Sequence, residues 1–178
     1  MSVIVPCYNE QATIRLLLDA IYCQTFPRER MDVVIADGMS TDQTRWVIGN
    51  YCSTHPDLKV QVVDNPKRSI PSGLNRALEA STGDIIVRLD AHSVPQADYI
   101  ARCVTALEKN LGETVGGVWD IHPGGKGWMA RSIAAVAAHP LGVGDARYRY
   151  TTQAGQVDTV PFGAYRRSTV QRIGAYDE

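Results

Sequence analysis

The chain has 178 residues, of which 44% are apolar and 21% are charged, and its formal net charge is −1 at pH 7. This length is sufficient for one domain with a sizeable core, and the composition is that of an ordinary globular protein. The near-zero charge, without basic runs between aromatic residues, argues against a nucleic acid as the partner. No apolar run reaches the roughly 18 residues that a membrane-spanning helix needs.

The cysteines are Cys7, Cys23, Cys52 and Cys103, which are widely spaced and form no C-x-x-C pair. This pattern predicts the reduced thiols of a cytoplasmic protein rather than disulfides or a zinc site. No basic segment precedes the first apolar run, so the sequence does not predict a secretory signal peptide.

Strand and helix patterns alternate through the first two thirds of the chain. Apolar runs predict strands at Ser2–Val5, Asp32–Ala36, Leu58–Val63 and Asp84–Leu89. Apolar residues at helical spacing predict helices at Gln11–Cys23, Thr41–Tyr51, Ile70–Ser81 and Ala97–Lys109. This order predicts an α/β fold in which helices cover both faces of a doubly wound, mostly parallel sheet.

The pattern changes after residue 115. Strands are predicted at Val115–Ile121 and Val160–Arg166, and helices at Trp128–Ala138 and Ser168–Ile173. The apolar stretch Trp128–Val143 predicts an amphipathic helix that packs on the sheet, and the alternative is a helix that lies near a membrane surface.

The most informative segment is the polar turn after the first strand, which contains Pro6, Tyr8, Asn9 and Glu10. Ligands of open α/β sheets bind beyond the carboxyl ends of the strands, so these residues lie where a ligand would be held. Tyr8 offers a flat ring on which a base can stack. Glu10 offers carboxylate oxygens to the hydrogen-bond donors of a ribose or a base.

The second strand is followed by Asp37 at the same edge of the sheet. A carboxylate at this place is able to accept a hydrogen bond from the imide N–H of uracil. The alternative is structural, because Asp-Gly-Met-Ser-Thr-Asp is also the pattern of an Asx-type turn followed by a helix cap.

The fourth strand is followed by Asp90-Ala91-His92. Side chains two residues apart in an extended segment project to the same side, so Asp90 and His92 are predicted to hold Mg²⁺ or Mn²⁺ against a diphosphate. The imidazole favours Mn²⁺, because Mg²⁺ prefers oxygen ligands. His92 alone would be read as an exposed loop histidine, and its place after Asp90 favours the metal site.

The loop after the third strand carries Lys67 and Arg68, and the following helix begins near Ser72 and Gly73. A helix N-terminus favours anions, and Arg68 is suited to pair with a phosphate or with a carbonyl of uracil. The alternative for this basic pair is a solvated loop without a ligand.

Together these segments resemble the family 2 glycosyltransferases, inverting enzymes of the GT-A fold, and the resemblance covers almost the whole chain. The motifs that carry it are Val5-Pro6-Cys7-Tyr8-Asn9-Glu10, Asp37-Gly38-x-Ser40-x-Asp42-x-Thr44, Gly73-Leu74-Asn75-Arg76-Ala77-Leu78, Gly83-Asp84-Ile85-Ile86, Asp90-Ala91-His92, Phe162-Gly163-Ala164-Tyr165-Arg166-Arg167 and Ile173-Gly174-Ala175-Tyr176-Asp177-Glu178. With Val143-Gly144-x-Ala146-Arg147-Tyr148-Arg149, they are most similar to the branch that makes bacterial exopolysaccharides such as succinoglycan.

The resemblance implies a role for each residue of a donor site. By this likeness Pro6, Tyr8 and Glu10 contact the nucleoside, Asp37 contacts the uracil, and Asp90 contacts the ribose and the metal region. His92 stands where the family usually has a second Asp and is implied as a metal ligand. Arg68 and Asn75 complete the predicted set of donor-binding residues.

The resemblance also implies where catalysis takes place. The family's general base lies in an acidic motif shortly after the Gly-x-Tyr-Asp-Glu segment, so we expect the base beyond Glu178 and identify no catalytic residue in this chain. We predict one domain over residues 1–178, with a nucleotide-binding half at 1–110 and the start of an acceptor half at 111–178. The abrupt end leads us to expect that a longer protein continues after it.

The function implied is transfer of a sugar, with inversion, from a UDP-sugar to a saccharide or lipid-linked acceptor, with Mn²⁺ or Mg²⁺ as cofactor. The full-length protein is expected at the cytoplasmic face of the bacterial inner membrane. The first alternative is a non-catalytic fragment that binds nucleotide-sugars. The second is a sugar-1-phosphate nucleotidyltransferase, which would need a Gly-rich basic loop where this chain has Pro6-Cys7-Tyr8-Asn9-Glu10.

Overall fold

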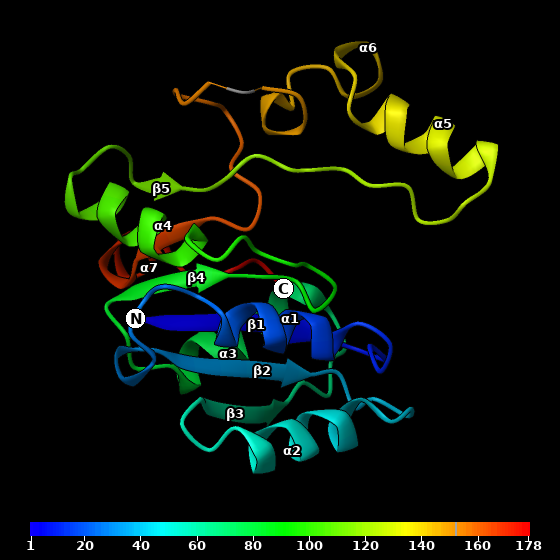
Figure 1. Cartoon of the computed structure of the whole chain (residues 1–178). Helices are drawn as coiled ribbons and strands as arrows, with labels where there is room; N and C mark the ends of the chain where they lie inside the picture. Colours follow the sequence, from blue (N-terminus) through cyan, green and yellow to red (C-terminus); the bar gives the residue numbers. More distant parts are fainter. Residues whose placement is uncertain (152) are drawn as a thin grey trace. The chain divides into compact units, whose positions relative to one another are not determined.

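The computed structural model describes residues 1–151 and 153–178, and Figure 1 shows the path of the chain. The chain divides into two units, of which the first comprises residues 1–115 and 162–178 and the second comprises residues 116–161. The first unit contains the sheet and every residue of the predicted donor site.

Six strands form one sheet in the order β3-β2-β1-β4-β6-β5. Their bounds are β1 Ser2–Cys7, β2 Asp32–Asp37, β3 Lys59–Asp64, β4 Ile85–Arg88, β5 Thr114–Val115 and β6 Ala164–Arg166. Strands β1 to β4 run parallel, whereas β6 is antiparallel to both β4 and β5. This confirms the predicted mostly parallel α/β sheet, because parallel neighbours require the helical crossovers that the alternating sequence pattern indicated.

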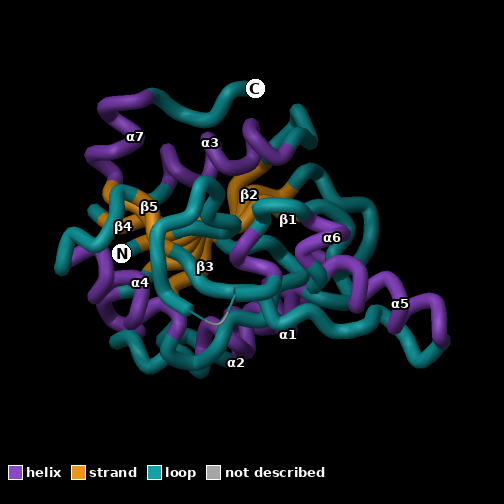
Figure 2. The backbone as a smooth tube through the Cα atoms, turned by 90° about the horizontal axis from the view of Figure 1, so that it is seen from above, coloured by secondary structure: helices purple, strands orange, loops and turns teal. Residues whose placement is uncertain are grey.

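Helices cover both faces of this sheet, as Figure 2 shows with α3 on one side of the strands and α1, α2 and α4 on the other. The helices of the first unit are α1 Ile14–Tyr22, the 3₁₀ turn Arg28–Arg30, α2 Thr44–Thr54, α3 Ile70–Ala80, α4 Tyr99–Glu108 and α7 Arg167–Ile173. Successive side chains of a strand point to opposite faces, so Val3 and Val5 pack under α1 while Ile4 packs under α3. The sheet is thereby buried on both faces, which explains why its strands are continuous apolar runs.

The second unit contains α5 Trp128–Ala137, α6 Pro140–Val143 and the 3₁₀ turn Arg147–Arg149. Trp119 gives this unit a small centre of its own: its backbone N–H donates to the carbonyl oxygen of Tyr148 at 2.7 Å, and the two rings meet edge to face with centroids 5.1 Å apart. The guanidinium carbon of Arg149 lies 4.6 Å from the centroid of the Trp119 ring, at a distance suited to a cation–π interaction.

One prediction for the part of the chain around the second unit is wrong and another is confirmed. The strand predicted at Val115–Ile121 reduces to Thr114–Val115, because only those residues find a strand partner in β6. The helix predicted at Trp128–Ala138 is confirmed as α5, and its packing on the sheet stays a prediction. In the described part of the chain, no helix combines the length and the apolar character needed to cross a membrane.

Candidate functional site

A pocket of about 170 Å³ lies at the carboxyl ends of the parallel strands. Its walls come from the loops after β1, β3 and β4 and are formed by Pro6, Cys7, Tyr8, Glu10, Asn65, Arg68, Ser69, Ile70, Asp90, Ala91 and His92. Strand β1 lies between β2 and β4, so the chain winds in opposite directions on its two sides and leaves a crevice at this edge. All the predicted site residues except Asp37 and Asn75 line this pocket.

The loops after β1 and β3 meet through Tyr8 and Arg68. The Tyr8 side chain is 44% exposed, and the guanidinium carbon of Arg68 lies 5.5 Å from the centroid of its ring. Asn9, Met39 and Arg68, one in each of the loops after β1, β2 and β3, have φ angles of 54°, 60° and 58°. A left-handed conformation is unfavourable for side chains such as Met and Arg, and such strain gathers at binding sites.

Glu10 connects three parts of the site. Its backbone N–H donates to the hydroxyl of Thr44 at 2.8 Å, which ties the β1 loop to the start of α2. Its carbonyl oxygen accepts from the backbone of Thr13 and Ile14, at the start of α1. Its carboxylate accepts from the Thr13 hydroxyl and lies 3.1 Å from Nδ1 of His92.

Asp90 begins a tight turn in which its carbonyl oxygen accepts from the backbone N–H of Ser93 at 2.9 Å and from the Ser93 hydroxyl at 2.7 Å. Its carboxylate lies 3.4 Å from a guanidinium nitrogen of Arg88, the last residue of β4. Ala91 is buried, whereas the side chain of His92 is 62% exposed. The turn therefore holds the backbone of the Asp90–His92 pair and leaves the imidazole open to a ligand.

The donor atoms of Asp90 and His92 fit a divalent cation that completes its coordination from elsewhere. The Asp90 carboxylate and the His92 imidazole line the same pocket, and among the described residues no group of three or more His, Cys, Asp or Glu forms a cluster suited to a metal. Mg²⁺ and Mn²⁺ sites that act on phosphates commonly use one or two protein ligands and take the remainder from water and the phosphate oxygens. The residues present therefore suit a cation that is bound together with a diphosphate.

Asp37 lies outside the pocket wall and its side chain is 0% exposed. Its carboxylate accepts from the backbone N–H of Ser40 at 3.0 Å, from the Ser40 hydroxyl at 2.5 Å and from the Nε–H of Arg45 at 2.6 Å. Arg45 donates also to Asp64 at 2.5 Å. The structure therefore shows Asp37 as the centre of the turn after β2, and its contact with a uracil stays a prediction.

Asn75 also lies outside the pocket wall and is buried. Its side-chain amide donates to the Tyr176 carbonyl oxygen and to the Glu178 carboxylate, both at 2.8 Å, and its oxygen accepts from the Tyr176 N–H at 2.9 Å. The Glu178 carboxylate also accepts a hydrogen bond from Lys67 at 2.7 Å. The hydrogen bond from Lys67, followed by that from Asn75, holds the pKa of Glu178 below its usual value. Asn75 thus fastens the segment Tyr176–Glu178 beside the basic loop, and a direct contact with the donor stays a prediction.

The family model of glycosyl transferase family 2 matches residues 2–174 of this chain. The chain belongs to that family. Succinoglycan biosynthesis protein ExoA of Rhizobium meliloti is 30% identical over 179 residues, which cover 99% of this chain and 52% of that protein. The predicted likeness to exopolysaccharide biosynthesis is thereby confirmed.

Other relatives extend the comparison. A Methanococcus voltae enzyme, dolichyl N-acetyl-alpha-D-glucosaminyl phosphate 3-beta-D-2,3-diacetamido-2,3-dideoxy-beta-D-glucuronosyltransferase, is 26% identical over 93% of this chain and 52% of its own length. The mannosyltransferase PcManGT of Pyrobaculum calidifontis, solved with GDP-Man and Mn²⁺, superposes with a TM-score of 0.70 at 29% identity over 99% of this chain and 47% of that one. S. aureus TarS 1–349 shares the fold, with a TM-score of 0.72 at 20% identity over 99% of this chain and 50% of that one. The chain spans about half the length of the curated relatives ExoA and the M. voltae enzyme.

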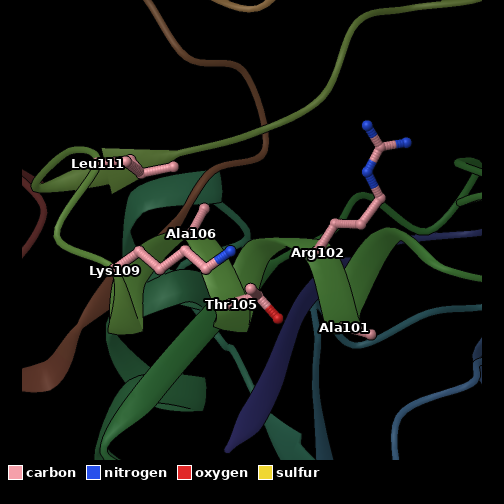
Figure 3. A pocket seen from close by; sticks show the side chains of 6 residues that line it. All are labelled: Ala101, Arg102, Thr105, Ala106, Lys109 and Leu111. Atoms are coloured by element: carbon pink, nitrogen blue, oxygen red, sulfur yellow. The ribbon is translucent and has the colours of Figure 1, made fainter.

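A second hollow of about 310 Å³ lies on α4 of this family 2 chain, and Figure 3 shows the six side chains that line it. They are Ala101, Arg102, Thr105, Ala106, Lys109 and Leu111. All come from one helix and the turn that follows it, and they include neither a carboxylate nor an aromatic ring. This surface therefore lacks the groups that a nucleoside and a metal ion require, and the pocket at the sheet edge is the better candidate.

Some lining residues were not predicted from the sequence. Asn65 is buried in the pocket wall and donates to the carbonyl oxygen of Ser69 at 2.9 Å, which closes the loop after β3. Gly73 permits this, because a Cβ there would lie 2.9 Å from the Asn65 amide nitrogen. The Asn-Pro pair before Lys67 was the only signal in the sequence, and it indicates a turn rather than a side chain in a site.

Cys7 lines the pocket of this family 2 chain but is no candidate nucleophile. Burial, reinforced by the nearby carboxylates of Asp37, Glu10 and Asp42, raises the pKa of the Cys7 thiol to about 12. A raised pKa keeps the thiol protonated near neutral pH, and a protonated thiol is a poor nucleophile. We expect iodoacetamide at pH 8 to label the exposed Cys23 first and Cys7 only after unfolding, as peptide mass mapping over time would show. Labelling of Cys7 as fast as Cys23 in the folded chain would contradict this assignment.

Replacing Asn75 by alanine should release the segment Tyr176–Glu178. Three hydrogen bonds to that segment are lost, and we expect the amide hydrogen of Tyr176 to exchange at least about tenfold faster. Hydrogen exchange followed by NMR measures this without any ligand. The matched control is Arg76→Ala at the neighbouring exposed position, which should leave the exchange of Tyr176 unchanged. Equal rates in wild type and Asn75→Ala would show that the segment is held by other contacts.

Proposed function

We propose that this chain binds a UDP-sugar together with Mn²⁺ or Mg²⁺ and serves in the transfer of its sugar, with inversion, to a saccharide or lipid-linked acceptor. The observation that carries the proposal is the pocket at the crevice beside β1, in which an aromatic ring, a guanidinium and the Asp90–His92 pair converge. Membership of glycosyl transferase family 2 supports the same reading.

Four of the lining residues have a chemical part in this proposal. Tyr8 presents a ring for stacking on the base, and Arg68 supplies positive charge for the diphosphate. Asp90 and His92 would hold the cation, which when bound neutralises the charge that develops on the departing diphosphate. The acceptor hydroxyl must lose a proton during direct displacement, and the carboxylate that takes it stays predicted beyond Glu178.

The acceptor class is supported by the relatives. The M. voltae enzyme is named for a dolichyl-linked sugar phosphate, which is a lipid-linked saccharide, and ExoA is named for the synthesis of a polysaccharide. We propose the same classes here and, because lipid-linked acceptors reside in membranes, we place the full-length protein at the cytoplasmic face of the bacterial inner membrane.

The nucleotide and the metal are tested by calorimetry with UDP, GDP and CDP, each with and without Mn²⁺. We expect UDP to bind best and Mn²⁺ to tighten it. PcManGT was solved with GDP-Man, so a preference for GDP is the result that would overturn the choice of uracil. UDP binding of equal strength with and without Mn²⁺ would instead contradict Asp90 and His92 as metal ligands.

A second candidate is a nucleotide-sugar-binding part without transfer activity of its own. The observation that favours it is that the chain spans about half the length of relatives such as ExoA. Release of UDP from a panel of UDP-sugars, with an oligosaccharide or lipid-linked acceptor, separates the two. Acceptor-dependent release supports the transferase, whereas binding without release supports the second candidate.

A further inference from the structure

Glu10 and His92 meet across the pocket from the loops of two neighbouring strands. Nδ1 of His92 lies 3.1 Å from Oε1 of Glu10, and strands β1 and β4, which carry them, pair directly in the sheet. The contact joins residues 82 positions apart in sequence, so it depends on the fold and not on a local turn. Both residues line the proposed donor pocket.

Other contacts hold Glu10 in place beside the imidazole. Thr44 fixes its backbone N–H, Thr13 and Ile14 fix its carbonyl oxygen, and the Thr13 hydroxyl donates to Oε2. The other carboxylate oxygen, Oε1, is the one that lies beside His92. A side chain restrained on this many sides presents one acceptor in one direction.

A fixed carboxylate beside one ring nitrogen decides the tautomer of a neutral histidine. The nitrogen next to the carboxylate carries the proton and donates it, so the lone pair is left on the other nitrogen. Histidines that bind metals usually have such a carboxylate or carbonyl behind them, because it fixes the ring and makes the ligating nitrogen more basic.

We propose that Glu10 is a positioning residue for the cation: it accepts the Nδ1–H of His92 and thereby leaves Nε2 as the ligand beside Asp90. This inference rests on the metal in the proposed function and assigns Glu10 a part other than contact with the nucleoside. The absence of a three-ligand cluster among the described residues agrees with it, because Glu10 then stands behind a ligand instead of being one. In this arrangement Glu10 orients His92, and His92 would bind the cation.

The first arm of the test measures Mn²⁺ affinity by electron paramagnetic resonance, without nucleotide and with saturating UDP. We expect Glu10→Ala to weaken Mn²⁺ binding about 10- to 100-fold, the usual effect of losing a residue behind a metal ligand. Glu10→Gln should lose less Mn²⁺ affinity, because its amide oxygen also accepts the Nδ1–H while its amide nitrogen, in the place of Oε2, donates to the Thr13 hydroxyl. His92→Ala should lose at least as much Mn²⁺ affinity as Glu10→Ala. The matched control is Glu79→Ala, at an exposed position, which should leave the Mn²⁺ affinity unchanged.

The same samples give a spectroscopic readout that a general loss of stability would not move. Electron spin echo modulation detects the imidazole nitrogen bound to Mn²⁺, and we expect its signal in wild type and Glu10→Gln. The signal should disappear in His92→Ala and weaken in Glu10→Ala when both are compared at equal Mn²⁺ occupancy. An undiminished imidazole signal in Glu10→Ala at equal occupancy would overturn the proposal.

The second arm measures UDP binding in EDTA, where no cation takes part. If Glu10 acts through His92, Glu10→Ala binds UDP as wild type does under this condition. Weaker metal-free UDP binding together with unchanged Mn²⁺ affinity would overturn the proposal and return Glu10 to the nucleoside. Wild-type protein that binds no Mn²⁺ in either condition would also overturn it. A chain that binds Mn²⁺ in the expected order of variants but binds no UDP would refute the proposed function and leave this inference standing.

Discussion

Replacing Asp90 by asparagine will remove most of the tightening that Mn²⁺ gives to UDP binding. The change keeps the size of the side chain and its place at the start of the Ser93 turn. It removes one of the two carboxylates that line the pocket, and the other is that of Glu10. Asparagine is a poor ligand for a divalent cation without a second carboxylate. We expect the ratio of UDP affinities with and without Mn²⁺ to fall at least about 10-fold, as calorimetry would show.

The control for this experiment is His55→Ala. His55 lies outside the pocket and stacks on the ring of Tyr51, with centroids 4.1 Å apart. This variant should leave the effect of Mn²⁺ on UDP binding as it is in wild type, which would show that loss of a polar ring elsewhere has no such effect. An Asp90→Asn variant that keeps the full metal effect would remove Asp90 from the proposed site.

Asp37→Ala should lower the free energy of unfolding by about 2 to 3 kcal/mol. Two donors of Ser40 and one of Arg45 lose a fully buried acceptor. The exposed part of Arg45 recovers water, which keeps the cost below that of a fully buried ion pair. Urea denaturation followed by circular dichroism measures the change.

Asp64→Ala is the matched control, because Asp64 pairs with the same arginine from a side chain that is 57% exposed. Removal of an exposed partner of an ion pair changes stability by no more than about 1 kcal/mol. Equal losses of stability for the two variants would show that burial of Asp37 is not what makes it important.

The Asp37→Ala protein also tests the predicted uracil contact. It should bind UDP and CDP more nearly equally, because cytosine lacks the imide N–H. If the variant still distinguishes UDP from CDP as wild type does, the role of Asp37 is structural and limited to the turn after β2.

The sheet and the pocket could be predicted from the sequence because both depend on short-range patterns. Parallel strands are apolar throughout, and the polar residues that follow them must gather at one edge. Tyr8, Glu10, Arg68, Asp90 and His92 therefore line one pocket, as their positions after the strands predicted, and their parts in binding a donor stay predictions.

The contacts of Asp37 and Asn75 could not be predicted in this way. Asp37 is joined to Arg45 through the start of a helix, and Asn75 is joined to Tyr176, which is 101 positions away. Such partners are decided by packing in three dimensions, and neither apolar periodicity nor turn residues report them. Within segment 116–161 the predicted helix at Trp128–Ala138 is confirmed as α5, whereas the strand predicted at Val115–Ile121 ends at Val115, because pairing with β6 depends on distant residues that the apolar run does not report.

Segment 116–161 is attached to the sheet at two neighbouring points. Val115 and Ala164 are register partners in the antiparallel pair β5 and β6, so the segment departs from the sheet and returns to it at adjacent points. An insertion with neighbouring ends is exchangeable, since the entropy of closing it grows only with the logarithm of its length. Segment 116–161 should therefore tolerate changes in length and sequence at little cost in stability, while the strands that carry the pocket keep their register.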